Sequence, residues 1–341
     1  MNKTKLTICI PSFNRLEKAK RCVSNLLDQI GDSEITLQVI DNGSPQNYIE
    51  EFSRVEKFDR AITMGVLSIM RNQFNTGMGA NFMRSFEVPT GDWLWMVADD
   101  DNLRDDAVRS VIDAINNHSR ESGLIVFGSI SKPPSNNVAV LKNFEEFVDF
   151  NYGSPGVFNR FIFLTNGVYK LSQFKDLISV GYNYLGTYIP HFMMQVAYMQ
   201  QGGQCVAIQK DIVDYIVPEI GYSYSIVAGL GVGSPKHTLV KTDLVHYKKY
   251  LSLFFPHNDY KVIIDLYYVC RRDADMHVCR HLAKNYLHYV ADARNSLHML
   301  SLRFFIYALR SPAIFDRLIT FFCTVSSRIK MHVAEIRMRY K

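Results

Sequence analysis

Three consecutive aspartates, Asp99, Asp100 and Asp101, are the residues of this sequence best suited to chemistry. They directly follow an apolar run, residues 93–98, which predicts a buried strand that delivers carboxylates to its C-terminal end. Adjacent carboxylates repel one another, so their clustering there is costly unless a cation or hydrogen-bond donors offset it. If strand geometry continues past the run, Asp99 and Asp101 share a face. They could then bind Mg²⁺ or Mn²⁺ and leave other positions on the metal for phosphate oxygens.

A structural role for the same aspartates is the alternative interpretation. The apolar residues between 107 and 115 have helical spacing, and aspartates before a helix often form a solvated turn and an N-cap. The rest of the chain must therefore decide between the two.

The composition of the 341-residue chain is that of a globular protein. Its formal net charge of +5 is far less basic than that of a typical nucleic-acid-binding domain, so we expect no nucleic-acid partner. Six cysteines stand at irregular spacings without a CxxC motif, which favours reduced thiols, a cytoplasmic location and no zinc site. The N-terminal apolar run is too short for a signal peptide. No segment reaches about 18 uninterrupted apolar residues, so no membrane-spanning helix is predicted.

Short apolar runs alternate with helical patterns over the first 130 residues. Strands are predicted at residues 6–10, 35–40, 66–70, 93–98 and 124–128, and Asn14 with Glu17 resembles a capping box that opens the first helix. This alternation predicts a mostly parallel α/β sheet flanked by helices, with polar sites at the carboxyl ends of the strands. Neither a GxGxxG after the first strand nor a GxxxxGK[ST] occurs, which excludes the usual dinucleotide and P-loop modes of phosphate binding.

Five short motifs follow one another in this part of the chain. They are Pro11-Ser12-Phe13-Asn14-Arg15, Asp41-Asn42-Gly43-Ser44, Asn75-x-Gly77 to Asn81, Gly91-Asp92-Trp93 and Asp99-Asp100-Asp101. Their order and spacing resemble those of the family 2 glycosyltransferases of GT-A fold. The resemblance covers residues 5–130 well and extends more loosely to about residue 215.

The resemblance implies roles for individual residues. In that family the aspartate that ends the second strand contacts the nucleotide base, the first loop lines the nucleotide pocket, and the D-x-D carboxylates bind the diphosphate through Mn²⁺ or Mg²⁺. The metal ligands would be Asp99 and Asp101. The residues that would bind the donor are Pro11, Ser12, Asn14, Arg15, Asp41, Asn75, Asn81, Asp99 and Asp100. Ala98 stands where the frequent D-x-D-D pattern has its first aspartate, so the metal ligands could differ by one position.

The general base is sought later in the chain. The family commonly places an acidic residue on a helix there, whereas this sequence has His191 after a proline. Histidine can accept a proton near neutral pH, although a lone histidine among apolar residues is more often structural. Asp211 is the other predicted catalytic residue, followed by Asp214.

The remaining sequence predicts two further regions. Residues 131–235 would complete a GT-A domain of residues 1–235 as its acceptor half, with aromatic residues that suit a sugar-binding floor or a core equally well. Residues 236–341 are predicted to be a helical C-terminal region. Apolar and basic residues recur from Arg303 to Lys341, which favours a helix lying on an anionic membrane surface; a solvated face and an oligomer contact are the alternatives.

Together these features predict an inverting glycosyltransferase that lies peripherally at the cytoplasmic membrane. It would move a sugar from a nucleotide-sugar donor to a glycan or lipid-linked acceptor in surface polysaccharide synthesis, such as that of O-antigen or capsule. Two other functions remain open. One is a non-catalytic scaffold on the same fold. The other is a sugar nucleotidyltransferase, which would need a glycine-rich loop after the first strand, where this chain has PSFNR.

Overall fold

The computed structural model describes most of the first 214 residues and parts of the remainder. The described residues are 5–31, 34–128, 137–152, 160–214, 240–254, 263–264, 267–268, 283–284, 296–325, 329–331 and 333–334. The chain divides into two compact units, one made of residues 1–185 and 189–216 and the other of residues 186–188 and 217–341. The predicted domain boundary at residue 235 lies outside the described residues.

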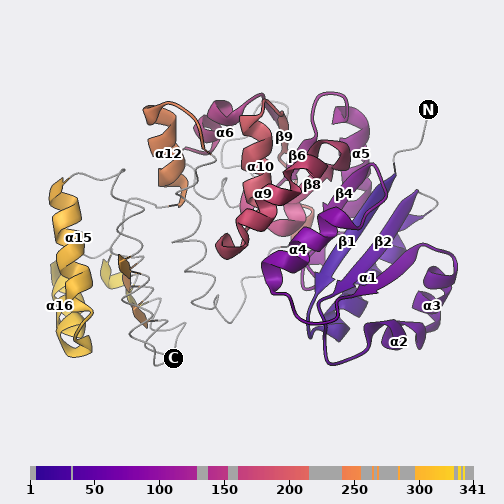
Figure 1. The fold of residues 1–341 in the computed structure, drawn as a ribbon, viewed down its shortest axis with the longest axis horizontal. Helices are drawn as coiled ribbons and strands as arrows, with labels where there is room; N and C mark the ends of the chain where they lie inside the picture. The colour runs from indigo at the N-terminus through magenta and orange to yellow at the C-terminus, as the bar shows by residue number, and fades with distance from the viewer. Residues whose placement is uncertain are drawn as a thin grey trace. The chain divides into compact units, whose positions relative to one another are not determined.

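An eight-stranded sheet forms the centre of the first unit (Figure 1), in the order β3-β2-β1-β4-β8-β6-β9-β7. Its strands are β1 (Leu6–Ser12), β2 (Ile35–Asp41), β3 (Leu67–Arg71), β4 (Trp93–Met96), β6 (Leu124–Phe127), β7 (Val138–Leu141), β8 (Gly167–Lys170) and β9 (Cys205–Ile208). Strands β1 to β4 are parallel, and β6 is parallel to β9. Only β8 and β7 run against their neighbours, so the predicted, mostly parallel sheet is confirmed.

Helices cover both faces of this sheet. They are α1 (Leu16–Ile30), α2 (Tyr48–Ser53), α3 (Glu56–Thr63), α4 (Met78–Glu87), α5 (Ala107–His118), α6 (Phe144–Asn151), α8 (Leu171–Phe174), α9 (Ile178–Asn183) and α10 (Pro190–Gln200). Successive side chains of β1 point to opposite faces of the sheet and contact different helices. Ile8 and Ile10 join Val23 of α1 in the main core, whereas Cys9 lies with its Sγ 3.8 Å from the carbonyl oxygen of Ser85 in α4.

Two local predictions differ from the structure. The first strand does not end before Pro11 but continues to Ser12. Proline is tolerated there because β4 pairs with β1 only as far as Cys9, so one side of the strand needs no further amide donor. The capping box is absent, since Arg15 is the N-cap of α1 and no side chain caps that end.

The second unit is mostly helical where it is described. It contains α12 (Leu244–Phe254), α15 (Ser296–Ala308) and α16 (Pro312–Val325), which agrees with the predicted helical C-terminal region. Phe305 and Phe315 join α15 to α16, with ring centroids 4.9 Å apart, in a core that also holds Leu302 and Ile319. None of the described helices combines the length and the hydropathy that crossing a membrane requires.

Candidate active site

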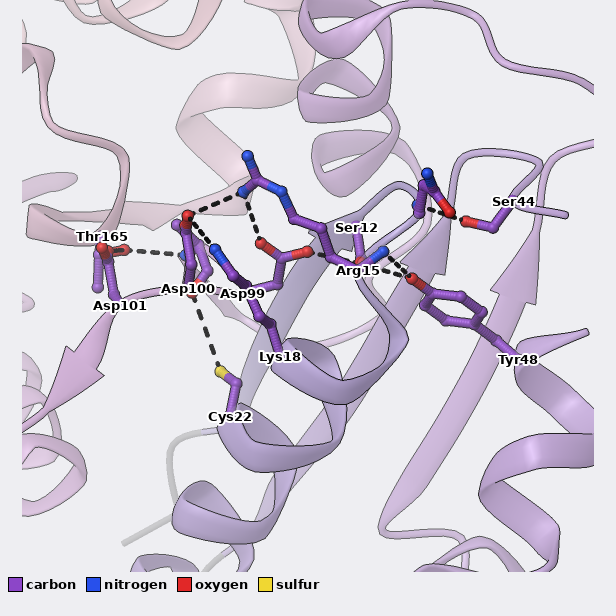
Figure 2. A network of polar contacts seen from close by, with 12 residues as sticks. Ser12, Arg15, Lys18, Cys22, Ser44, Tyr48, Asp99, Asp100, Asp101 and Thr165 are labelled. Atoms are coloured by element: carbon purple, nitrogen blue, oxygen red, sulfur yellow. Dashed lines mark hydrogen bonds and ion pairs between the residues drawn. The ribbon is translucent and has the colours of Figure 1, made fainter. Parts of the chain in front are cut away.

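Three polar loops meet at one edge of the sheet. Because β1, β2 and β4 are parallel, their carboxyl ends lie on the same side, and Ser12 stands opposite Asp41 in the register of β1 and β2. The aspartates that follow β4 reach the same place, as Figure 2 shows for the contacts between Ser12, Arg15 and Asp99. Short side chains at this edge can therefore cooperate although they are far apart in the sequence.

Asp99 is the most enclosed of the three consecutive aspartates. Only 4% of its side chain is exposed, and its Oδ2 accepts a hydrogen bond of 2.6 Å from the hydroxyl of Ser12. Its Oδ1 accepts one of 3.2 Å from Nη1 of Arg15. Burial raises the pKa of Asp99 above its ordinary value, and the contacts with Ser12 and Arg15 offset that effect only in part. The negative charge of the Asp99 carboxylate is therefore only partly compensated by its present contacts, and a cation would stabilise it further.

Asp100 and Asp101 differ in their surroundings. Asp100 lies at the exposed rim, where its Oδ2 accepts hydrogen bonds from Arg15 (2.9 Å) and Lys18 (3.3 Å). Asp101 accepts a short hydrogen bond from the hydroxyl of Thr165. The pKa of Asp101 is raised to about 6, chiefly by burial and also by the charges of the two neighbouring aspartates, while the hydrogen bond from Thr165 lowers it.

The strand alternation predicted for these aspartates is absent. Strand β4 ends at Met96, and the amide of Asp101 donates to the carbonyl oxygen of Ala98 at 3.2 Å, so the aspartates stand in a turn. Asp99 is then held by a residue of β1, whereas Asp101 is held by Thr165, just before β8. A shared strand face consequently cannot be the reason for pairing the two carboxylates.

The chemistry of Asp99 and Asp101 nevertheless fits a hard divalent cation. Carboxylate oxygens are the ligands that Mg²⁺ and Mn²⁺ prefer. Both carboxyl groups have pKa values raised by burial, which Ser12 and Arg15 offset only in part at Asp99 and Thr165 offsets only in part at Asp101. Within the described part of the chain, no three His, Cys, Asp or Glu side chains form a group that could hold a metal ion. A metal here would need further oxygens, such as those of water or a diphosphate.

The loop after β1 is fixed by buried hydroxyl groups. Asn14 has a positive φ of 52°, and its amide donates to Oγ of Ser44 at 2.8 Å. The amide of Arg15 donates to the hydroxyl of Tyr48 at 2.9 Å, and that hydroxyl lies 3.1 Å from Oγ of Ser12. Pro11, also buried, is part of β1 itself. The predicted donor-binding loop is therefore tightly held at its backbone.

Asp41 is fully buried at the end of β2. Its Oδ1 accepts a hydrogen bond of 2.9 Å from the amide of Ser44, which holds the following turn. Its Oδ2 lies 3.6 Å from Nη1 of Arg71 but accepts no hydrogen bond from any described residue. A buried acceptor of this kind is costly, and an N–H group of a ligand would relieve it.

A cluster of amide side chains holds the loop that precedes α4. Asn42 is its centre. Nδ2 of Asn42 donates to Oδ1 of Asn75 (2.8 Å), while its Oδ1 accepts from Asn72 (2.9 Å) and from the hydroxyl of Thr76 (2.9 Å). Asn81 is buried and donates to the carbonyl oxygen of residue 40 at 3.2 Å. Asn75 and Asn81 thus position the loop, and any contact with a donor stays a prediction.

Glycine is required at one point where this loop meets β2. Gly43 has a φ of 74°, and a Cβ there would lie 2.7 Å from the backbone carbon of Phe74. The DNGS motif therefore serves the close approach of two backbones, whatever it binds.

His191 lies in α10, away from solvent. Only 2% of it is exposed, its Nε2 lies 2.8 Å from the carbonyl oxygen of Ile162, and its ring meets Phe82 edge to face. Burial lowers the pKa of His191 to about 4, and its Nδ1 has no hydrogen-bond partner among the described residues. These surroundings are those of a structural histidine, so they disfavour the predicted role as general base.

The other predicted bases lie between β9 and the end of β10 (Val213–Asp214), which pairs with β5 (Asn102–Leu103) just after the three aspartates. Asp211 is half-buried. Asp214 is exposed, and its Oδ1 accepts a hydrogen bond of 2.9 Å from Nε of Arg104. The pairing of β10 with β5 brings this segment to the strand that follows the aspartates, so Asp211 is better placed than His191.

Replacing His191 by glutamine tests its structural role through pH. The unfolded state binds a proton near the ordinary histidine pKa of 6.5, whereas the folded state resists it down to about pH 4. Stability is therefore complete above the unfolded pKa and falls as the pH falls. Between pH 7 and pH 5 we expect this residue to cost the wild type about 2 kcal/mol of unfolding free energy. In denaturant titrations, the free energy of unfolding should fall less between pH 7 and pH 5 in His191→Gln than in the wild type, by about that amount. The same pH dependence of stability in His191→Gln and in the wild type would contradict the buried, neutral histidine.

Several residues of this site were not predicted from the sequence. Tyr48, Thr165 and Arg71 come from α2, from the segment before β8 and from the end of β3. Ser44 was part of a quoted motif without a role. No local pattern marks Tyr48 or Thr165, because only the pairing of distant strands brings them to the aspartates.

The segment that builds this edge matches the model of a known protein family. Residues 7–166 match the model of Glycosyl transferase family 2. The match contains strands β1 to β4, all three polar loops and Thr165. Comparison with curated protein sequences gives no match.

Several solved structures resemble this chain in fold. TarS residues 1–349 from S. aureus superposes with a TM-score of 0.57 at 12% identity, covering 91% of this chain and 88% of that one. The complex of the same protein with UDP-GlcNAc gives 0.55 at 11%, with the same coverage. The mannosyltransferase PcManGT from Pyrobaculum calidifontis, in complex with GDP-Man and Mn²⁺, gives 0.53 at 14%, covering 99% and 86%. At these identities the likeness concerns the fold, and the predicted GT-A architecture is confirmed.

Proposed function

We propose that this protein is a glycosyltransferase that takes its sugar from a nucleoside-diphosphate sugar. The observation that carries the proposal is the meeting of Asp41, Ser12 and Asp99 at one carboxyl edge of the sheet, within the segment that matches the family model. In open α/β sheets that edge is where ligands bind. Asp41 would accept hydrogen bonds from the nucleotide base, and the buried aspartates would hold the diphosphate end.

Asp99 and Asp101 are the residues that would bind Mn²⁺ or Mg²⁺. The bound metal would stabilise the negative charge of the departing diphosphate. Ser12 and Thr165 keep the two carboxylates in place through their hydroxyl groups. A neighbour in complex with GDP-Man and Mn²⁺, and another in complex with UDP-GlcNAc, support both a nucleotide-sugar donor and a divalent cation.

The acceptor side rests on the resemblance to the family. We infer inversion at the sugar carbon, with Asp211 as the residue to test as general base and Asp214 after it. A glycan or lipid-linked acceptor in surface polysaccharide synthesis is the proposed substrate. The scaffold alternative differs in one respect, since a scaffold would bind the donor without releasing nucleoside diphosphate.

A screen of donors tests the proposed function. Thermal unfolding would be measured with UDP-, GDP- and dTDP-sugars, each with Mn²⁺ and with a chelator. A ligand that binds only the folded state raises stability with its concentration. We expect one donor class to raise the melting temperature in a metal-dependent way. Absence of any such shift across the panel would contradict the proposal.

The exposed surface of α15 supports an anionic membrane as partner. Four apolar side chains with helical spacing form a stripe there and are each more than half exposed. They are Leu297, Leu300, Phe304 and Tyr307. Arg303 and Arg310 are exposed on the same helix and the turn after it, and the only acid in residues 296–325 is Asp316. Apolar and basic groups together are what an anionic lipid surface binds.

The double substitution Leu300→Ser with Phe304→Ser should weaken binding to anionic liposomes about tenfold, because each side chain loses part of the roughly 2 kcal/mol that burying it in lipid provides. Binding by the wild type should also weaken with salt, which screens the arginines. Met64→Ser is the matched control, since Met64 in the first unit is 65% exposed against 64% for Leu300. Equal loss in both variants would contradict a specific surface. The predicted basic residues Arg328, Arg337, Arg339 and Lys341 lie outside the described residues.

A further inference from the structure

Arg15 is the counter-ion of Asp99 and Asp100. Its Nη1 lies 3.2 Å from Oδ1 of Asp99 and 2.9 Å from Oδ2 of Asp100, so one nitrogen joins both carboxylates (Figure 2). The other oxygen of Asp99 accepts the Ser12 hydroxyl. A metal ion binding Asp99 through Oδ1 would thus meet a guanidinium nitrogen already beside that oxygen, and two positive charges so close repel each other.

The side chain of Arg15 can leave without unfolding its loop. About half of it is exposed to solvent. Its backbone amide is held separately by the hydroxyl of Tyr48 at 2.9 Å, and the amide of Asn14 is held by Ser44. The loop geometry therefore does not depend on where the guanidinium lies.

We propose that Arg15 competes with the divalent cation for Asp99. In the ligand-free protein it neutralises the aspartates and weakens the binding of free metal. A metal that arrives with a nucleoside diphosphate displaces it more easily, because two phosphate oxygens can accept parallel hydrogen bonds from the planar guanidinium in exchange. This inference rests on the proposed function, since it concerns the same metal and the same donor.

Lys18 provides a matched control. It also faces the cluster from α1, but among the described residues its Nζ forms an ion pair only with Asp100, at 3.3 Å, and both side chains are well exposed. Arg15→Met and Lys18→Met remove the same charge, yet only the first frees Asp99. Arg15→Gln is a second, polar variant in case the methionine variant does not fold.

Titration with Mn²⁺ alone, followed by electron paramagnetic resonance of the free ion, tests the competition without any sugar transfer. We expect Arg15→Met and Arg15→Gln to bind Mn²⁺ about fivefold more tightly than the wild type, and Lys18→Met to change the affinity less than about twofold. The increase in melting temperature on adding Mn²⁺ should likewise be larger in the Arg15 variants. Asp99→Asn should lose this Mn²⁺ binding.

Three results would overturn the inference. Weaker Mn²⁺ binding in the Arg15 variants would mean that Arg15 positions Asp99 for the metal. Equal tightening in Lys18→Met would reduce the effect to net charge, and unchanged binding in Asp99→Asn would place the ion elsewhere. If the wild type binds no Mn²⁺, with or without UDP or GDP, the metal site of the proposed function is wrong as well. If it binds Mn²⁺ but one of the three results above is found, only the competition by Arg15 is wrong.

Discussion

Asp101→Asn and Asp99→Asn should each remove the metal dependence of nucleotide-sugar binding while the fold survives. Asparagine keeps an oxygen to accept the hydroxyl of Thr165 or Ser12, so little stability should be lost. The negative charge that a cation needs disappears, however. Losing one partner of a buried charged contact costs about 3 kcal/mol, which corresponds to an affinity about 150-fold weaker in the presence of Mn²⁺.

Calorimetry of the donor with Mn²⁺ and with a chelator measures this effect. Asp100→Asn is the matched variant, because the carboxylate of Asp100 lies at the exposed rim and, in the described part of the chain, accepts hydrogen bonds only from Arg15 and Lys18. We expect it to weaken binding by less than about threefold. If Asp100→Asn proves as damaging as Asp101→Asn, the metal ligands are displaced by one position, as Ala98 in place of an aspartate allows. Wild-type affinity that is the same with and without chelator would exclude the metal site.

Asp41→Asn should weaken binding of the free nucleoside diphosphate about 10- to 100-fold, even with the metal site intact. Asparagine can still accept the amide of Ser44 through Oδ1, so the turn is preserved. The Oδ2 atom of Asp41, which accepts no hydrogen bond from a described residue, becomes an NH₂ group in the variant. This donor would face the N–H groups of a base. Hydrogen bonds to charged groups contribute about 1.5 to 3 kcal/mol, which gives the expected range.

Asp92→Asn serves as the control for Asp41. Asp92 is exposed at the amino-terminal edge of the sheet, where its Oδ2 accepts the amide of Lys5 at 3.3 Å. Its replacement should leave nucleotide affinity unchanged. If Asp41→Asn also leaves it unchanged, Asp41 has only the structural role of holding the turn.

The strands that carry the site were predictable because their signals are local. Residues 35–40 have apolar residues at alternate positions and residues 124–128 are an apolar run, both bounded by polar turns, and β2 (Ile35–Asp41) and β6 (Leu124–Phe127) end within one residue of the prediction. Polar residues directly after such runs, such as Asp41, must then lie at the carboxyl edge of a parallel sheet. The position of the aspartates at that edge thus follows from hydrophobic patterning alone.

The contacts within the site were not predictable, because they depend on pairing between distant strands. Strand β8 runs antiparallel beside β4, and this brings Thr165 to Asp101 across 64 positions of sequence. The alternation assumed for Asp99 and Asp101 also failed, since the strand ends at Met96 and a turn follows. His191 illustrates a third limit. Its sequence neighbours are apolar, but only the packing of Phe82 and Ile162 around it shows that it is buried.

Release of nucleoside diphosphate from the donor identified by thermal unfolding tests the central claim most directly. The measurement compares the wild type with Asp101→Asn, each with Mn²⁺ and with chelator, in the presence of a glycan or lipid-linked acceptor. We predict release coupled to transfer in the wild type with Mn²⁺, and a rate at least about 100-fold lower in the variant or with chelator. Tight, metal-dependent donor binding without any release would contradict the account and identify the protein as a non-catalytic scaffold on the glycosyltransferase fold.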